Sequence, residues 1–286
     1  MSNSRAGATR HGAFCCFLLT AAAVLPLQAA KAGDAAYPSE VDAVYRLSFN
    51  GFNVGKYRFN SHYDGKSYTA NGKTDISALF GAFKWAGNFI GSGSVETSGG
   101  PRPASFEMST KTKSKTTSVK LSFDGTRVVS VALVPNKSPS AEAVKLKPEN
   151  LQNVFDPMGA TLAISNANAA DACNRTIPVF DGKARYDLRL SLKGREPLKE
   201  KQPSGQPPEL VVCQVKYVPI AGHKPKDFVN PWIDYDHIEI ALRAVPAAGI
   251  YVPYRVTVPS SIGPAVMTID TINITAANNQ QIALKQ

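Results

Sequence analysis

Apolar and polar residues alternate along most of the chain from Val41 onward, and this period of two predicts β-strands. Residues 44–49 (VYRLSF) show the alternation most clearly. The Asn50-Gly51 pair that follows favours the tight turn of a β-hairpin, because both residue types tolerate a positive φ. We therefore expect residues 44–49 and 52–59 to form an antiparallel pair of strands.

The same alternation recurs toward the C-terminus, with glycine and asparagine turns between the apolar segments. One short helix is expected at residues 157–166, since Asp156 can cap its free amides and Pro157 suits a first helical position. An antiparallel sheet of this length must curl to protect its edges. The predicted fold is therefore all-β and mainly antiparallel: a highly curved, barrel-like or spiral-like sheet with one short helix. Further strands are expected at residues 67–76, 104–112, 118–123, 127–134, 176–180, 184–192, 210–217, 238–245, 251–258 and 265–275.

Three segments depart from the alternation. Residues 78–95 are rich in phenylalanine, tryptophan and glycine, which indicates either a strand bent by glycine or an aromatic loop that plugs one mouth of the sheet. Residues 135–150 are polar and contain several prolines, as in a connection, and residues 194–208 are expected to form an exposed loop. None of these segments is long enough to separate two cores, so a single domain is expected.

Residues 1–32 have the pattern of a secretory signal peptide. Basic residues precede a short apolar run at residues 12–27, and the first acidic residue of the chain is Asp34. Small residues place the expected cleavage after Ala32, with Ala29 and Ala30 as alternative sites. Residues 33–286 are then expected to form one secreted, β-rich domain.

An uncleaved N-terminal anchor helix is the alternative to a signal peptide. The small-residue cleavage site favours removal, and the apolar run is short for a membrane span. A lipoprotein anchor is less compatible, because Cys15 and Cys16 lie inside the apolar run and not directly after it. Residues 33–286 contain no stretch of 18 apolar residues, which is the length typical of a transmembrane helix.

The chain is basic, with 32 Lys and Arg against 22 Asp and Glu and a formal charge of +10. Removal of residues 1–32 leaves 29 basic against 22 acidic residues, a charge of +7, so the basic character belongs to the folded part. Such a charge favours anionic neighbours such as phosphate-bearing lipids, nucleic acid or acidic polymers. The secretory signal argues against nucleic acid.

Two cysteines, Cys173 and Cys213, remain after residues 1–32 are removed. An even pair in an oxidising compartment predicts a disulfide, with two buried free thiols as the alternative. No metal site and no cofactor are expected, because no histidine lies at ligand spacing from either cysteine and no phosphate-binding glycine loop occurs.

Four ordered blocks carry a family resemblance: LQNVFDPMGATLA at 151–163, CNRTIPVFDGKARYDLRLSL at 173–192, VVCQVKYVPIAGHKP at 211–225 and YVPYRVTVPSSIGPAVMTI at 251–269. Together they resemble the bacterial domain-of-unknown-function family numbered 3108, found in cell-envelope proteins of Gram-negative bacteria. The resemblance implies a secreted, β-rich periplasmic protein with a curved, barrel-like sheet. It also implies an architecture similar to the open barrels that carry lipoproteins and to the β-spiral proteins that support envelope integrity. The family has no established catalytic residues to transfer.

The sequence contains no convincing catalytic set. The best candidates for a general base are His223 and His237, the second of which lies close to Asp234 and Asp236. If residues 234–239 form a strand, Asp234 and Asp236 face away from His237. We expect both histidines to have packing or surface roles.

Two groups of residues are candidates for ligand binding. The first comprises Phe80, Phe83, Trp85 and Phe89, which could line or cover an apolar cavity or simply pack in the core. The second comprises Lys111, Lys113 and Lys115, which on one strand would line a single exposed face. That face could bind lipid phosphates, or it could be the lysine-protected edge of a sheet.

The expected function is a non-enzymatic periplasmic protein that supports the cell envelope by binding a lipid-like, apolar or anionic ligand, or a protein partner, through its curved sheet. One alternative is a hydrolase or transferase that acts on an envelope polymer, with His223 or His237 as base. The other is a purely structural scaffold. The sequence does not specify the ligand, the partner or the oligomeric state.

Overall fold

Fourteen strands form one antiparallel sheet within the residues that the structure describes. The structure is a computed structural model and describes residues 37–285, apart from 79–80, 97–99, 137, 167–171, 201–205 and 229–231. The strands are β1 (Glu40–Phe49), β2 (Phe52–Tyr63), β3 (Ser67–Ala78), β4 (Phe83–Val95), β5 (Pro101–Thr112), β6 (Thr116–Asp124), β7 (Arg127–Val134), β8 (Arg175–Phe180), β9 (Arg185–Pro197), β10 (Glu209–Ala221), β11 (Ile238–Val245), β12 (Ile250–Val258), β13 (Ala265–Thr275) and β14 (Gln281–Lys285).

The contacts divide the chain into two units, Met1–Gly33 and Asp34–Gln286. The fold described here belongs to the second unit. The expected signal peptide, its cleavage site and the anchor alternative lie outside the described residues.

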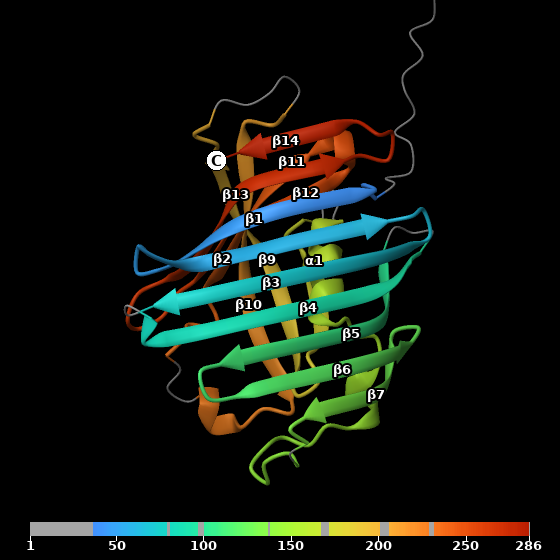
Figure 1. Cartoon of the computed structure of the whole chain (residues 1–286), viewed down its shortest axis with the longest axis vertical. Helices are drawn as coiled ribbons and strands as arrows, with labels where there is room; N and C mark the ends of the chain where they lie inside the picture. The colour runs from blue at the N-terminus through green and yellow to red at the C-terminus, as the bar shows by residue number, and fades with distance from the viewer. Residues whose placement is uncertain are drawn as a thin grey trace, which may run out of the picture. The chain divides into compact units, whose positions relative to one another are not determined.

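The sheet consists of two meanders that meet along one pair of strands. Strands β8–β13 follow each other from one end of the sheet to the junction, where β13 pairs with β1, and β1–β7 continue in the same direction to the other end (Figure 1). β14 adds to β13 beside this junction. The predicted all-β, strongly curved, mainly antiparallel sheet is therefore confirmed, and its two ends, β7 and β8, are not paired with each other.

A single α-helix, α1 (Pro157–Ser165), lies within the described part of the connection between the two meanders. Figure 1 shows it behind β3 and β4, and it contacts strands of both meanders: β4 and β5 of the first, β8 and β12 of the second. Six of its nine residues are buried, so apolar residues surround the helix instead of forming one stripe. Three short 3₁₀ helices complete the secondary structure of the described residues: Pro148–Leu151, Pro225–Phe228 and Pro246–Ala248.

The start of α1 is fixed by Asp156, as the sequence predicts. Its Oδ1 atom accepts hydrogen bonds from the backbone N–H groups of Met158 at 2.8 Å and Gly159 at 3.1 Å, and Pro157 occupies the first helical position. The helix ends one residue earlier than expected, with Asn166 as its C-cap.

A short extended segment before α1 brings the two ends of the sheet together. The backbone N–H of Val154 donates to the carbonyl of Thr126, in the turn before β7. The next residue, Phe155, exchanges backbone hydrogen bonds of 2.9 Å with Pro178 and Phe180 of β8. The sheet thus stays open in its strand order, but backbone hydrogen bonds of this segment bridge its two ends.

The predicted disulfide between Cys173 and Cys213 is present. It ties the segment before β8 to β10, and both cysteines are buried in one apolar cluster with Ala160 and Ile164 of α1. The bridge closes a separation of 40 residues. In the loop-entropy description, such a link stabilises the fold by about 4 kcal/mol.

Residues 83–95 of the aromatic and glycine-rich segment form strand β4, so this part is a strand and not a plugging loop. Trp85, Gly87, Phe89 and Gly91 occupy alternate positions, so they share one face. A Cβ atom at Gly91 would lie 2.8 Å from the Cβ of Met158, so glycine is needed there for α1 to pack closely.

Two expectations at the C-terminal half need correction. The polar segment expected to be an exposed loop continues β9 as far as Pro197. Its charges form ion pairs with other strands: Arg195 with Glu209 of the neighbouring β10, and Glu196 with Arg255 of β12 at 2.6 Å. The short strand β14 was not predicted, although Ile282 and Leu284 alternate and are buried.

Candidate functional site

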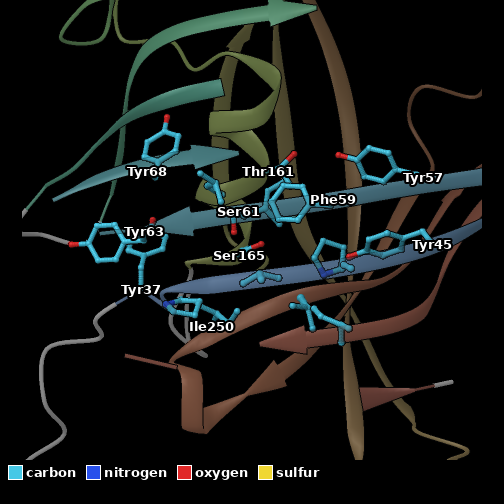
Figure 2. Close-up of a pocket in the computed structure, with 18 of the residues that line it drawn as sticks. Tyr37, Tyr45, Tyr57, Phe59, Ser61, Tyr63, Tyr68, Thr161, Ser165 and Ile250 are labelled. Atoms are coloured by element: carbon cyan, nitrogen blue, oxygen red, sulfur yellow. The ribbon is translucent and has the colours of Figure 1, made fainter. Parts of the chain in front are cut away.

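A cavity of about 170 Å³ lies between the inner face of the sheet and α1. Its walls come from β1, β2 and β3 of the first meander, from β11, β12 and β13 of the second, and from the helix. Figure 2 shows Tyr45 and Tyr57 on one side of the cavity and Tyr37, Tyr63 and Tyr68 on the other. Phe59, Ser61, Thr161 and Ser165 lie between them.

Strand periodicity explains why these side chains meet. Val41, Ala43 and Tyr45 alternate along β1, so all three point to the same side of the sheet. On the neighbouring strand, Tyr57 and Phe59 do the same, and Ala43 is directly paired with Phe59. The aliphatic part of the wall is Ile240, Ile250, Val252, Val256, Met267 and Ile272.

Two phenol groups of the cavity have unsatisfied hydrogen-bonding potential. The hydroxyl oxygens of Tyr37 and Tyr68 are buried, and neither has a hydrogen-bond partner among the described residues. Burial raises the pKa of both phenols above the ordinary value, so both are neutral donors at physiological pH. An unsatisfied buried donor costs about 1–3 kcal/mol, which a ligand oxygen in hydrogen-bonding reach would recover.

The opposite side of the cavity is also aromatic but has a different arrangement. The rings of Tyr45 and Tyr57 lie 5.9 Å apart with an interplanar angle of 32°. Burial raises the pKa of Tyr57 to about 12, so this phenol is neutral as well. Burial also raises the pKa of Tyr45, so these four phenols are neutral at physiological pH and the walls of the cavity favour an uncharged, apolar guest.

Asp156 lies close to the tyrosine-lined cavity without lining it. The carboxyl group is fully buried, and burial raises its pKa to about 6, against the opposing effect of the two amides that it caps. Its Oδ2 atom has no described hydrogen-bond partner. The negative charge of Asp156 contributes to the raised pKa of Tyr68, which places a titratable group beside that phenol.

The volume determines which guests fit. A cavity of about 150 Å³ with an apolar lining is large enough for a benzene ring. The cavity here is of that size, so it can hold one small ring or the end of an alkyl chain. A whole lipid would have to extend beyond it.

None of the four aromatic residues expected to bind a ligand is among the described lining residues of this cavity. Phe80 lies outside the described residues. Phe83 is exposed to 49%, and Phe89 packs against the core cluster beside β5 and β6. Trp85 lies in a separate open depression together with two of the predicted lysines, Lys111 and Lys113.

The expectation of a lysine stripe on one strand face is wrong. β5 ends at Thr112, so only Lys111 lies on the strand. Lys113 and Lys115 belong to the turn before β6, which Thr112 closes with a side-chain hydrogen bond to the Lys115 amide at 3.1 Å. All three lysines are exposed, and Lys115 lines a different groove from the other two.

The histidine candidates do not come together. The geometry expected for Asp234 and His237 needs correction, because both lie in a turn before β11, where the His237 Nδ1 atom is 2.8 Å from a carboxylate oxygen of Asp234. This pair is exposed. His223 lies elsewhere, with its ring edge against Phe228. Among the described residues, no group of three or more His, Cys, Asp or Glu side chains could hold a metal ion.

The sequence does contain a signal for the tyrosine-lined cavity. Five of the ten tyrosines fall within residues 37–68, at positions that mostly share one strand face. The phenylalanine and tryptophan side chains at residues 80–89 are more apolar than these tyrosines. The tyrosines combine a large apolar surface with a polar end, which suits the wall of a cavity better than a fully packed core.

Comparisons with known proteins identify a family but no activity. Residues 44–270 match the sequence profile of a family described as a protein of unknown function, DUF3108. Among curated proteins, none matches this chain. Among solved structures, the chain is similar to the crystal structure of a beta-barrel-like protein of domain of unknown function DUF1849 from Brucella abortus. That similarity has 11% identity, a TM-score of 0.45 and coverage of 83% of this chain and 98% of the other.

Proposed function

Because this chain belongs to the DUF3108 family, whose description assigns no function, we propose a function from its own geometry. The protein is a non-enzymatic binding protein of the cell envelope that holds the apolar part of a lipid-like ligand between its curved sheet and α1. The observation that carries this proposal is the cavity of about 170 Å³ with apolar walls and two phenol donors that have no partner among the described residues. Apolar walls with a few polar groups that fix orientation are typical of small-molecule sites.

The proposed compartment is the periplasm. The signal-like pattern of residues 1–32 supports it, and so does the disulfide between Cys173 and Cys213, because disulfides persist in oxidising compartments. No helix in the described part of the chain has the length and apolarity needed to cross a membrane.

The first experiment is native mass spectrometry with lipid extraction, on mature protein purified from the periplasm of its own host. We expect a stoichiometric co-purifying lipid or apolar molecule. A clean apo mass would contradict a resident ligand and would favour a structural scaffold or a protein partner, which crosslinking in the periplasm would then identify.

A second experiment tests the cavity with two probes of similar shape, toluene and acetophenone. Both should bind, and acetophenone more tightly, because its ketone oxygen can accept a hydrogen bond from a buried phenol of the lining that has no described partner. The variant Tyr37→Phe/Tyr68→Phe should lose the preference for acetophenone and retain toluene binding. Calorimetric titration measures both affinities.

A cavity-filling variant separates this cavity from other apolar surfaces. Ser61→Leu places an isobutyl group in the cavity and should abolish binding of both probes. Ser191→Leu adds the same side chain at an exposed position of β9 and should leave binding unchanged. Equal binding by all three proteins would show that the probes bind elsewhere and would contradict the proposal.

The alternative of a hydrolase or transferase is tested by His223→Ala/His237→Ala. Under the proposed function this variant folds, keeps its co-purifying ligand and complements a deletion strain. Loss of complementation by a folded variant that keeps its co-purifying ligand would instead support an enzyme that uses one of these histidines as a base.

A further inference from the structure

A second hollow of different chemistry lies at the end of the sheet where β6 and β7 approach the β8–β9 turn. This groove has a volume of about 720 Å³. Five chain segments line it: the start of β6, the end of β7, residues 138–146, the β8–β9 turn and the loop after β10. We call it the basic groove.

Its charge is strongly one-sided. Four lysines line it, Lys115, Lys145, Lys183 and Lys224, against a single acidic residue among its described lining, Asp227. Among the described residues, Lys224 has a carboxylate partner, Glu142, at 3.7 Å, whereas no ion pair is formed by Lys115, Lys145 or Lys183. Ammonium groups gathered around one concave surface create a positive potential that attracts anions.

The walls of the basic groove are rigidly built. Val144 and the loop after β10 are joined by two backbone hydrogen bonds, from Val144 N–H to His223 at 2.9 Å and from Gly222 N–H to Val144 at 2.7 Å. Gly222 has a φ of +82°, and a Cβ atom there would lie 1.9 Å from the carbonyl oxygen of Lys183. The lysine-bearing turn is therefore held directly against this loop.

A polar atom inside the wall is also unsatisfied. The Nδ1 atom of His223 is buried and has no hydrogen-bond partner among the described residues, and His223 lines the groove. Serine and threonine hydroxyls add further hydrogen-bonding groups: Thr117, Ser118, Ser138 and Ser140.

Part of the groove is apolar and exposed. Val134 at the end of β7 is exposed to 62%, and Leu146 on the facing segment to 37%. Leu133, Pro135, Pro139 and Val144 continue this surface. An inorganic anion would use the lysines but leave the apolar part uncovered, whereas an anion with attached acyl chains would contact both parts.

We propose that the basic groove binds the phosphate headgroup and first acyl carbons of an anionic phospholipid. The lysines and hydroxyls contact the phosphate, and the apolar part contacts the chain next to it. This site is lined by none of the residues of the tyrosine-lined cavity and does not depend on the function proposed for that cavity.

The test uses dihexanoyl phosphatidylglycerol below its critical micelle concentration, titrated into the full mature protein by calorimetry. Dihexanoyl phosphatidylcholine and inorganic phosphate are the comparison ligands. The variant Lys115→Gln/Lys183→Gln removes two groove charges. Its matched control, Lys111→Gln/Lys113→Gln, removes two charges outside the groove, one of them in the same turn.

We expect phosphatidylglycerol to bind at least about tenfold more tightly than phosphatidylcholine. The groove variant should bind phosphatidylglycerol about tenfold or more weakly than wild type does. The control should change it by less than about twofold. Equal effects of the two lysine pairs would reveal non-specific attraction and overturn the proposal. Absence of binding would overturn it too.

The apolar half of the proposal has its own variant. Val134→Ser should lower the affinity for phosphatidylglycerol and leave the affinity for inorganic phosphate unchanged. The control is Val129→Ser, because Val129 is exposed on the same strand but lies outside the groove, and it should change neither affinity. Inorganic phosphate that binds as tightly as phosphatidylglycerol would show an anion site without a lipid part, and would refute the lipid assignment.

Discussion

Asp156 gives the stability of this fold a pH dependence that the structure allows us to work out. The carboxyl group is fully buried at the start of α1, and burial raises its pKa from 3.8 to about 6. A pKa that is higher in the folded state means that the folded protein binds the proton more tightly than the unfolded chain does. This contribution to stability is therefore fully present below pH 3.8 and is lost as the pH rises through about 6.

The magnitude follows from the size of the shift. The pKa rises by about two units, and each unit corresponds to about 1.4 kcal/mol, so the full contribution of Asp156 is about 3 kcal/mol, of which about 2 kcal/mol is lost between pH 4 and pH 8. In the variant Asp156→Asn, the side-chain oxygen of the amide can still accept from both backbone N–H groups, but the side chain carries no charge. The stability of the variant should therefore not fall in this way as the pH rises.

The assay is urea unfolding of wild type and Asp156→Asn between pH 4 and pH 8, with the disulfide intact. The quantity of interest is the difference in free energy of unfolding between the two proteins, because the contributions of the other titrating groups are the same in both and cancel in this difference. Wild type should lose about 2 kcal/mol relative to the variant across this range. Asp156→Ala should instead be less stable at every pH by about 1 kcal/mol or more, since it leaves the cap amides without an acceptor.

Asp64 provides a control, because its contribution to stability should depend on pH with the opposite sign. It is exposed, and hydrogen bonds from the backbone amides of Ser67 and Lys66 lower its pKa. Its contribution is present above the unfolded pKa and disappears as the pH falls through the lower folded value. Asp64→Asn should thus show a difference that grows with rising pH. A difference for Asp156→Asn that is flat, or that has the same sign as for Asp64→Asn, would refute the reasoning.

Two other features of the fold give simple predictions. Removal of the disulfide by Cys173→Ala/Cys213→Ala should lower the free energy of unfolding by about 4 kcal/mol, and wild type in reductant should unfold at the same urea concentration as this variant. A loss below about 1 kcal/mol would contradict the loop-entropy account. Gly91→Ala should cost about 1–3 kcal/mol, because its methyl group would meet Met158, whereas Gly194→Ala, with no atom within 4 Å, should change stability by less than about 0.5 kcal/mol in the same assay.

Local patterns in the sequence were sufficient to predict most of the elements. Strand β11 and strand β13 have the bounds expected from their alternation, and the capping role of Asp156 needs only the residues next to it. The disulfide was also within reach, because the expected removal of residues 1–32 leaves two cysteines and therefore a single pairing. The elements and the cap depend on residues that are neighbours in sequence, and the disulfide depends on the number of cysteines.

The lysine prediction failed for a physical reason. Alternation of lysine with serine or threonine at residues 110–115 fits a strand, but the same residues also favour a turn. Thr112 uses its hydroxyl to close the turn on Lys115, and the strand stops there. The sequence alone does not show whether the backbone of these residues forms a strand or a turn.

The two proposed binding sites were beyond a local reading because their walls meet only through the sheet order. The tyrosine-lined cavity exists because β1 pairs with β13, which places Tyr45 and Ile272 on neighbouring strands although they lie near opposite ends of the chain. The basic groove likewise joins Lys115 to Lys224 through the approach of the two sheet ends. Both sites therefore depend on the order of the strands and on the curvature of the sheet, which together bring these distant segments close to each other. Variants that disturb that curvature should therefore affect both sites, whereas Ser61→Leu should affect only the first and Lys115→Gln/Lys183→Gln only the second.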